Sequence, residues 1–115
     1  MATRRPKTEE DEASQRGLGF AVIQLRREQG LSREEVAKRG GLTTDTITAI
    51  EDTGQEPTWG NLRRIAQGLR VETEELCSLA VELAPGKAGG RIRRREREAR
   101  QRREKRLQTA GEKQA

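Results

Sequence analysis

The chain has 115 residues, of which 30% are hydrophobic and 37% are charged, so a single compact core cannot include all of it. One cysteine cannot form an internal disulfide, and a sequence without histidine lacks the common zinc-ligand sets. The formal net charge of +5 is unevenly distributed, since residues 1–89 carry 13 Lys and Arg against 15 Asp and Glu, whereas residues 90–115 carry 11 against 4. A basic segment beside a nearly neutral domain favours a polyanion partner, most often nucleic acid.

The first 16 residues are polar and are expected to form a mostly disordered N-terminal arm, with the alternative that the acidic run from Glu9 to Glu12 extends into the start of the first helix. Apolar spacing then predicts a helix over residues 18–29, with Phe20 and Leu25 among the side chains available to the core, and Gly30 ends it. The N-terminus carries no apolar stretch of signal-peptide length, and no segment approaches the roughly 20 apolar residues that span a bilayer. We therefore expect a cytoplasmic protein.

Two short helices separated by a glycine turn are predicted next. Ser32 and Glu35 form a capping box for the first helix. Gly41 ends that helix, because glycine adopts a positive φ without steric cost. Thr43 is a natural N-cap for the second helix. The expected ranges are residues 33–39 and 44–52. This is the layout of a helix-turn-helix, whose second helix enters a DNA major groove.

Two further helices and a basic tail follow. Thr58 can cap a fourth helix, in which we expect Trp59 to lie in the core or to anchor the helix. A fifth helix opens at residue 72 or 73 and carries Cys77, expected as a buried structural thiol. The tail has strong helix formers but too few apolar residues for a coiled-coil seam, which favours a solvated helix or a helix–coil mixture.

The expected fold class is all-α, a compact five-helix bundle with a basic C-terminal helical tail. The expected parts are a disordered arm at 1–16, a helix-turn-helix domain at 17–84, a flexible linker with the sequence PGKAGG at 85–90 and an Arg-rich tail at 91–115.

Residue types at fixed offsets in this motif are shared with a known family. The residues that match are Arg33, Val36, Ala37, Gly41, Ile47 and Ile50. The stretch from about residue 18 to 83 resembles the Cro/repressor-type helix-turn-helix family, often called XRE-like. That resemblance implies a lambda-repressor-like DNA-binding domain.

The resemblance also assigns roles to single residues. Thr44 and Asp45 occupy positions that reach base edges, with Ala49 as a third. Arg33 matches a position where the side chain and the helix N-terminus meet a phosphate, which is sound chemistry because both attract anions. Further DNA-binding candidates are Lys38, Arg39, Thr43, Thr46 and Thr48. The resemblance places a partly buried, structural ion pair at Arg26 and Glu51.

Two of these assignments have a plainer alternative. The polar residues after Thr43 can be a capped, solvated helix face that reads no bases. Arg33 can be an ordinary surface arginine paired with nearby acidic residues.

The tail can supply the positive charge that the domain lacks. Residues 18–83 carry 8 Lys and Arg against 11 Asp and Glu, and a domain of that charge binds DNA weakly alone. Arginine exceeds lysine nine to two in residues 90–115, a bias that favours forked phosphate contacts over mere solubility. The chief candidates for backbone contact are Arg93, Arg94 and Arg97.

The function expected is a sequence-specific regulator of transcription that binds double-stranded DNA, with homodimerisation left open. The alternative is a protein-interaction module, an antitoxin or coactivator-like adaptor, whose tail binds RNA or an acidic protein partner. No nucleophile–base pair, metal cluster or phosphate-binding loop is recognisable, so we expect no enzyme activity, no cofactor and no metal.

Overall fold

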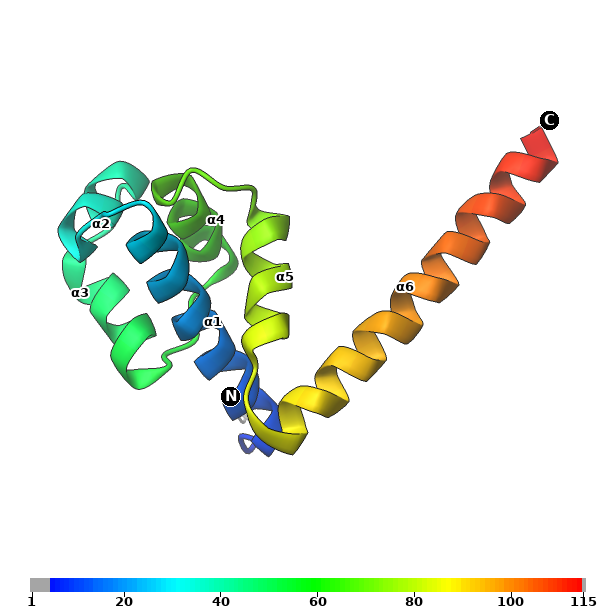
Figure 1. Ribbon diagram of the computed structural model, residues 1–115, viewed down its shortest axis with the longest axis horizontal. Helices are drawn as coiled ribbons and strands as arrows, with labels where there is room; N and C mark the ends of the chain where they lie inside the picture. Colours follow the sequence, from blue (N-terminus) through cyan, green and yellow to red (C-terminus); the bar gives the residue numbers. More distant parts are fainter. Residues whose placement is uncertain (1–4, 115) are drawn as a thin grey trace.

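The computed structural model describes residues 5–114, and within that range the chain is all-α, as expected, without strands. A bundle of short helices occupies one side of the molecule, and a long helix projects from it (Figure 1). The described residues form six α-helices and one π-helical segment. They are α1 (Glu9–Glu28), α2 (Arg33–Gly40), α3 (Thr44–Thr48), η1 (Ala49–Thr53), α4 (Trp59–Gly68), α5 (Thr73–Leu83) and α6 (Gly86–Gln114).

Helix α1 begins well before the predicted start. Thr8 and Asp11 form a capping box in which the Thr8 hydroxyl accepts from the Asp11 amide at 3.1 Å and the Asp11 carboxylate accepts from the Thr8 amide at 3.0 Å. Four acidic residues in the first turn add a favourable interaction with the helix dipole. The disordered arm is therefore wrong from Glu9 onward, and residues 1–4 lie outside the described range.

The core is one cluster of aliphatic side chains from α1 to α5. Its largest fully buried members are Ile47, Ile50, Ile65, Leu69, Leu76, Val22 and Val36. Helices α2 and α4 approach so closely that a Cβ at Gly68 would lie 2.4 Å from the Val36 carbonyl oxygen. The α2–α3 unit is therefore held against the rest of the bundle by backbone contact as well as by side chains.

Three predicted core residues are more exposed than expected. Burial along α4 decreases toward its N-terminus, from buried Ile65 through half-buried Leu62 to Trp59, which is 67% exposed at the helix's first residue. Phe20 is 45% exposed because Ala21 and Val22 occupy the inward face of α1. Cys77 is half-buried rather than buried, and this burial raises the pKa of its thiol.

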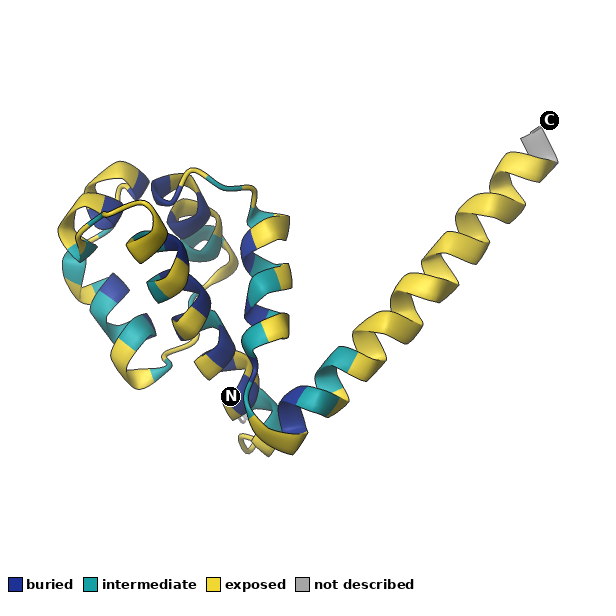
Figure 2. Ribbon diagram, viewed as in Figure 1, coloured by how far each residue is buried: buried dark blue, intermediate teal, exposed yellow. Residues whose placement is uncertain are grey.

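The segment 85–90 is not a flexible linker. Residues 86–90 form the first turn of α6, where Figure 2 shows buried positions, and Ala88 packs with Ala13, Ala84 and Ile92 in a second small cluster. Gly89 is required here because a Cβ would lie 1.9 Å from the Ala84 carbonyl oxygen. Gly89 thus serves a close approach between two chain segments, and α6 begins at Gly86 instead of at residue 91.

None of the described helices is long and apolar enough to cross a membrane. The same residues hold no group of three or more His, Cys, Asp or Glu side chains placed to bind a metal ion.

Candidate nucleic-acid interface

Local hydrogen bonds build the turn between α2 and α3. The Ser32 hydroxyl accepts from the Glu35 amide and the Glu35 carboxylate accepts from the Ser32 amide, each at 3.1 Å. Helix α2 is followed by its C-cap Gly41, which has a φ of +70°. The Thr43 hydroxyl then accepts from the Thr46 amide at 3.3 Å and caps α3. The predicted caps of both helices are confirmed.

Helix α3 presents a polar face to solvent. Ile47 and Ile50 are buried, whereas Asp45 is exposed and Thr44 and Thr48 are half-buried. Burial of one face fixes the rotation of the helix, so the other face is available to a partner.

The second half of the predicted helix departs from α geometry. From Ala49 the chain widens into the π-helical segment η1, which ends at Gly54 with a φ of +66°. The Gly54 amide donates to the Ala49 carbonyl, as does the Thr53 hydroxyl. The helix over residues 44–52 is therefore regular only as far as Thr48.

A buried carboxylate holds α3 and η1 against α1 and α2. The Glu51 side chain is fully buried and accepts from Arg26 Nε at 2.9 Å, from Arg26 Nη2 at 2.8 Å and from Arg33 Nε at 3.0 Å. Arg26 Nη1 also donates to the Leu31 carbonyl at 3.1 Å. The expected ion pair between Arg26 and Glu51 is thus present, and the Glu51 hydrogen bonds raise the pKa of Arg26.

Arg33 is held by carboxylates. Its Nη1 and Nη2 atoms form a fork on Asp52 at 3.1 and 2.7 Å, and these hydrogen bonds are the main reason that the pKa of Arg33 is raised. The plainer alternative, a surface arginine paired with acidic neighbours, describes this arrangement. Asp52 is half exposed, at 51%, so a phosphate that approaches Arg33 has to compete with it.

A shallow groove of about 300 Å³ runs between α3 and the start of α4. Three predicted residues, Asp45, Thr46 and Ala49, line it. Gln55 and Asn61 line the opposite side, and sequence reasoning missed both as candidates. The spacing of three residues from the cap Thr58 places Asn61 in the first turn of α4. Nothing in the sequence indicated that this turn lies beside α3.

The remaining candidates lie elsewhere. Lys38 and Arg39 are exposed in the last turn of α2. Arg94 and Arg97 are exposed on α6. Arg93 is half-buried, and its Nη1 donates to carbonyl oxygens at the end of α5, so this atom is already occupied.

Comparison with known proteins agrees with this geometry. The family model of the helix-turn-helix domain matches residues 18–79, a range that ends before α6. The chain is 40% identical over 61 residues to the uncharacterized HTH-type transcriptional regulator y4dJ of Sinorhizobium fredii (strain NBRC 101917 / NGR234). The aligned stretch covers 53% of this chain and 79% of that protein.

Solved structures share the fold. The wild-type restriction-modification controller protein C.Esp1396I superposes with a TM-score of 0.55 and 23% identity, covering 60% of this chain and 90% of that one. The nucleoprotein complex of C.Esp1396I gives a TM-score of 0.59 with 22% identity, covering 64% and 95%. At this level of identity the likeness concerns the arrangement of helices.

Proposed function

The chain belongs to the helix-turn-helix domain family, and from this we propose that it is a DNA-binding regulator of transcription whose α3 enters the major groove of duplex DNA. The observation that carries the proposal is the α2–turn–α3 unit. Its caps and buried apolar face hold the polar side of α3 outward in one orientation. The relationship to y4dJ, a protein described as a transcriptional regulator, supports the same function.

The chemistry of α3 suits base recognition. Thr44 and Thr48 can hydrogen-bond base edges or contact a thymine methyl group, and Asp45 can accept from the N4 amino group of cytosine. The Ala49 methyl group offers a further apolar contact. Gln55 and Asn61, across the groove from α3, carry amides that can donate to phosphate or pair with adenine.

Phosphate contact by α2 requires a rearrangement of one side chain. Arg33 Nε stays on buried Glu51 while Nη1 and Nη2 leave Asp52 for a phosphate oxygen at the α2 N-terminus. Lys38 and Arg39 offer weaker backbone contacts. Asp52 therefore acts as an internal competitor, and DNA binding by this face is weaker than the fold alone predicts.

The test is selection of bound fragments from a pool of random duplexes at about 150 mM salt, near physiological ionic strength. We expect an enriched motif that weakens or changes in the double variant Thr44→Ala/Asp45→Ala. The control Ser78→Ala/Glu82→Ala alters exposed residues of α5 and should select the same motif as the wild type.

Absence of any motif from all three proteins would overturn the proposal. The acidic domain would then be better interpreted as a protein-interaction module. A motif that is identical in the α3 variant would show that another surface reads the sequence.

A further inference from the structure

Helix α6 leaves the bundle on the side away from α3. In Figure 1 α2 and α3 lie at one edge of the molecule, and α6 projects from the opposite side. Helix α6 packs against α1 and α5, whereas α3 packs against α2 and η1. The basic helix and the base-reading face are therefore separated by the whole width of the bundle.

Hydrogen bonds to the end of α5 fix the direction of α6. Arg93 Nη1 donates to the carbonyl oxygens of Val81 at 3.2 Å, Glu82 at 3.1 Å and Ala84 at 2.7 Å. A helix leaves its last carbonyls short of backbone partners. The Val81 oxygen also accepts from the Ala84 amide at 3.3 Å, and the half-buried positive donor of Arg93 is favourable at this helix end. The turn between α5 and α6 is thus closed by a side chain of α6 itself.

Ion pairs with the start of α1 provide a second attachment. Arg91 lies 3.3 Å from Glu10 and 3.4 Å from Glu9, and Arg95 also pairs with Glu10. Together with the cluster of Ala13, Ala84, Ala88 and Ile92 described above, they hold the first two turns of α6. The tail is therefore a directed helix and not a flexible tether that can fold back onto DNA bound by α3.

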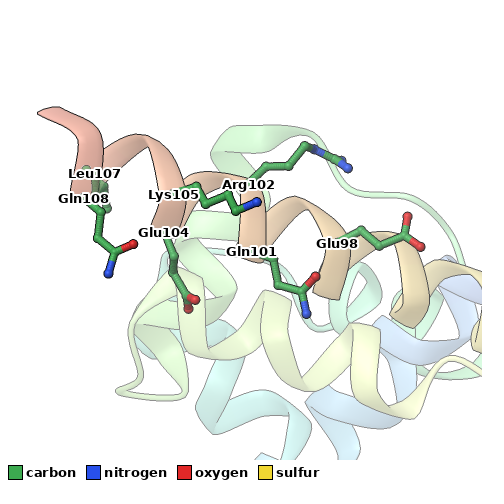
Figure 3. Close-up of a pocket in the computed structure, with 7 residues that line it drawn as sticks. All are labelled: Glu98, Gln101, Arg102, Glu104, Lys105, Leu107 and Gln108. Carbon is green, nitrogen blue, oxygen red and sulfur yellow. The ribbon is translucent and has the colours of Figure 1, made fainter.

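Beyond these two turns α6 is solvent-exposed on every side (Figure 2). Residues 94–107 carry 8 Lys and Arg against 3 Glu. Figure 3 shows a shallow depression on α6, with Arg102 and Lys105 extending from the helix beside it. All seven residues that line this depression belong to α6, so it is an open helix surface and not a ligand cavity. The opposite side of the helix, facing α5, carries Arg100, Arg103 and Arg106.

The composition of α6 favours a duplex over a single-stranded nucleic acid. Arginine forks match phosphate oxygens, and backbone contacts of this kind need no base recognition. Residues 86–114 contain no Phe, Trp or Tyr, so the helix lacks the stacking side chains with which proteins bind unpaired bases. A protein bound to its site is also surrounded by other duplex segments of the same DNA at high effective concentration.

We propose that α6 binds the phosphate backbone of a second DNA duplex while α3 occupies the first, so that one molecule bridges two DNA segments. This inference rests on the proposed function of α3. It replaces the expectation that the tail adds affinity for the same duplex, because the anchored direction of α6 carries its charge away from that duplex.

The experiment is a two-duplex capture with the full chain. A duplex that carries the selected motif is immobilised, and a labelled duplex without the motif is offered in solution. The variant Arg100→Gln/Arg102→Gln/Arg103→Gln/Arg106→Gln removes four charges that do not anchor α6. The control Gln101→Ala/Gln108→Ala alters the same helix without changing its charge.

We expect the wild type and the control to capture the labelled duplex, and the four-arginine variant to capture it about tenfold less. Its affinity for the motif duplex should change less than about twofold, because these arginines do not reach that duplex. Circular dichroism should show unchanged helix content, since glutamine is a good helix former.

Three results would overturn the inference. A large loss of affinity for the motif duplex in the four-arginine variant would place α6 on the same DNA as α3. Unchanged capture by that variant would mean that other surfaces, such as the α3 faces of two molecules, bridge the duplexes. Preferential displacement of the labelled duplex by a double-stranded RNA competitor would assign α6 to RNA. If no motif exists but the labelled duplex binds through α6, the function proposed for α3 fails and nucleic-acid binding by α6 stands alone.

Discussion

The α3 face and α6 differ in charge, because acidic residues surround α3 whereas the free part of α6 is strongly basic. Around α3 the surface carries Asp45 and Asp52, and the Arg33 guanidinium, which reaches Asp52, is held by carboxylates. The free part of α6 is dominated by arginine and has few neighbours. A face with little positive charge has low affinity for DNA of arbitrary sequence. Its affinity for DNA therefore depends on contacts with the bases.

The two regions also differ in how firmly they are packed against the bundle. The α2–α3 unit is held by backbone contact with α4, a buried ionic network and two caps, whereas α6 depends on the two turns at its start. A surface that reads bases needs a rigid support, while a surface that contacts only phosphates tolerates movement. Four changes test this comparison, and they are arranged from the largest expected effect to the smallest.

The substitution Gly68→Ala should have the largest effect. The added Cβ would lie 2.4 Å from the Val36 carbonyl oxygen, so α2 and α4 must move apart. We expect a loss of about 3 kcal/mol in the free energy of unfolding, measured by urea denaturation. The matched change Gly111→Ala, at a position with nothing within 4 Å, should stabilise α6 by up to about 1 kcal/mol. Equal effects at both positions would contradict the contrast between a packed and a free region.

The substitution Gly89→Ala should detach α6 without unfolding the bundle. Its Cβ would lie 1.9 Å from the Ala84 carbonyl oxygen, and the first turn of α6 cannot retain its present packing. We expect faster hydrogen exchange at the start of α6 and about tenfold weaker capture of a second duplex, with an unchanged motif in selection.

The neighbouring position provides the control for that change. Gly90 has nothing within 4 Å, so Gly90→Ala should leave capture intact and slightly raise helix content. If Gly90→Ala weakens capture as much as Gly89→Ala does, the packing against Ala84 is not what directs α6.

Features built from residues close in sequence were predictable. The capping box of Ser32 and Glu35 and the cap at Thr43 depend on spacings of three residues, and both are present. The pair of Arg26 and Glu51 is distant in sequence, yet the resemblance to a known family indicated it. The box of Thr8 and Asp11 obeys the same local rule, so the early start of α1 was readable as well.

Features that depend on contacts between distant segments were not predictable. A glycine-rich segment is typical of linkers, and only the approach of Ala84 shows why Gly89 is a glycine. The exposure of Trp59 depends on where the core ends, which the periodicity of α4 does not reveal. Acidic neighbours were one alternative for Arg33, but the fork on Asp52 joins residues on two different elements, so the sequence did not identify the partner.

The substitution Asp52→Asn should strengthen DNA binding. It removes the charge that competes with phosphate for Arg33 while Glu51 still positions Nε. We expect about three- to tenfold tighter binding to the selected motif and a salt dependence steeper by about one counterion. The measurement is fluorescence anisotropy across a salt series. The double variant Asp52→Asn/Arg33→Ala should lose the gain, and a gain that persists there would mean general charge relief instead of a released arginine.

Acidification should have the smallest effect, and it should act on the attachment of α6. The hydrogen bond from Arg95 lowers the pKa of Glu10 below its ordinary value of 4.5, and the Thr8 amide and Arg5 lower the pKa of Asp11 below 3.8. Carboxyl groups with a lowered folded-state pKa contribute stability above their ordinary pKa and lose it as the pH falls through the folded-state pKa. We therefore expect the start of α1 and the first turns of α6 to loosen below about pH 4, before the core melts. Amide exchange followed by NMR across this range measures the loosening.

Glu10→Gln should already show weaker protection of α6 at pH 7, whereas Glu12→Gln, in the same turn of α1, should match the wild type. Equal behaviour of the two variants would remove Glu10 from the attachment and leave Arg93 and the alanine cluster to hold α6 in place.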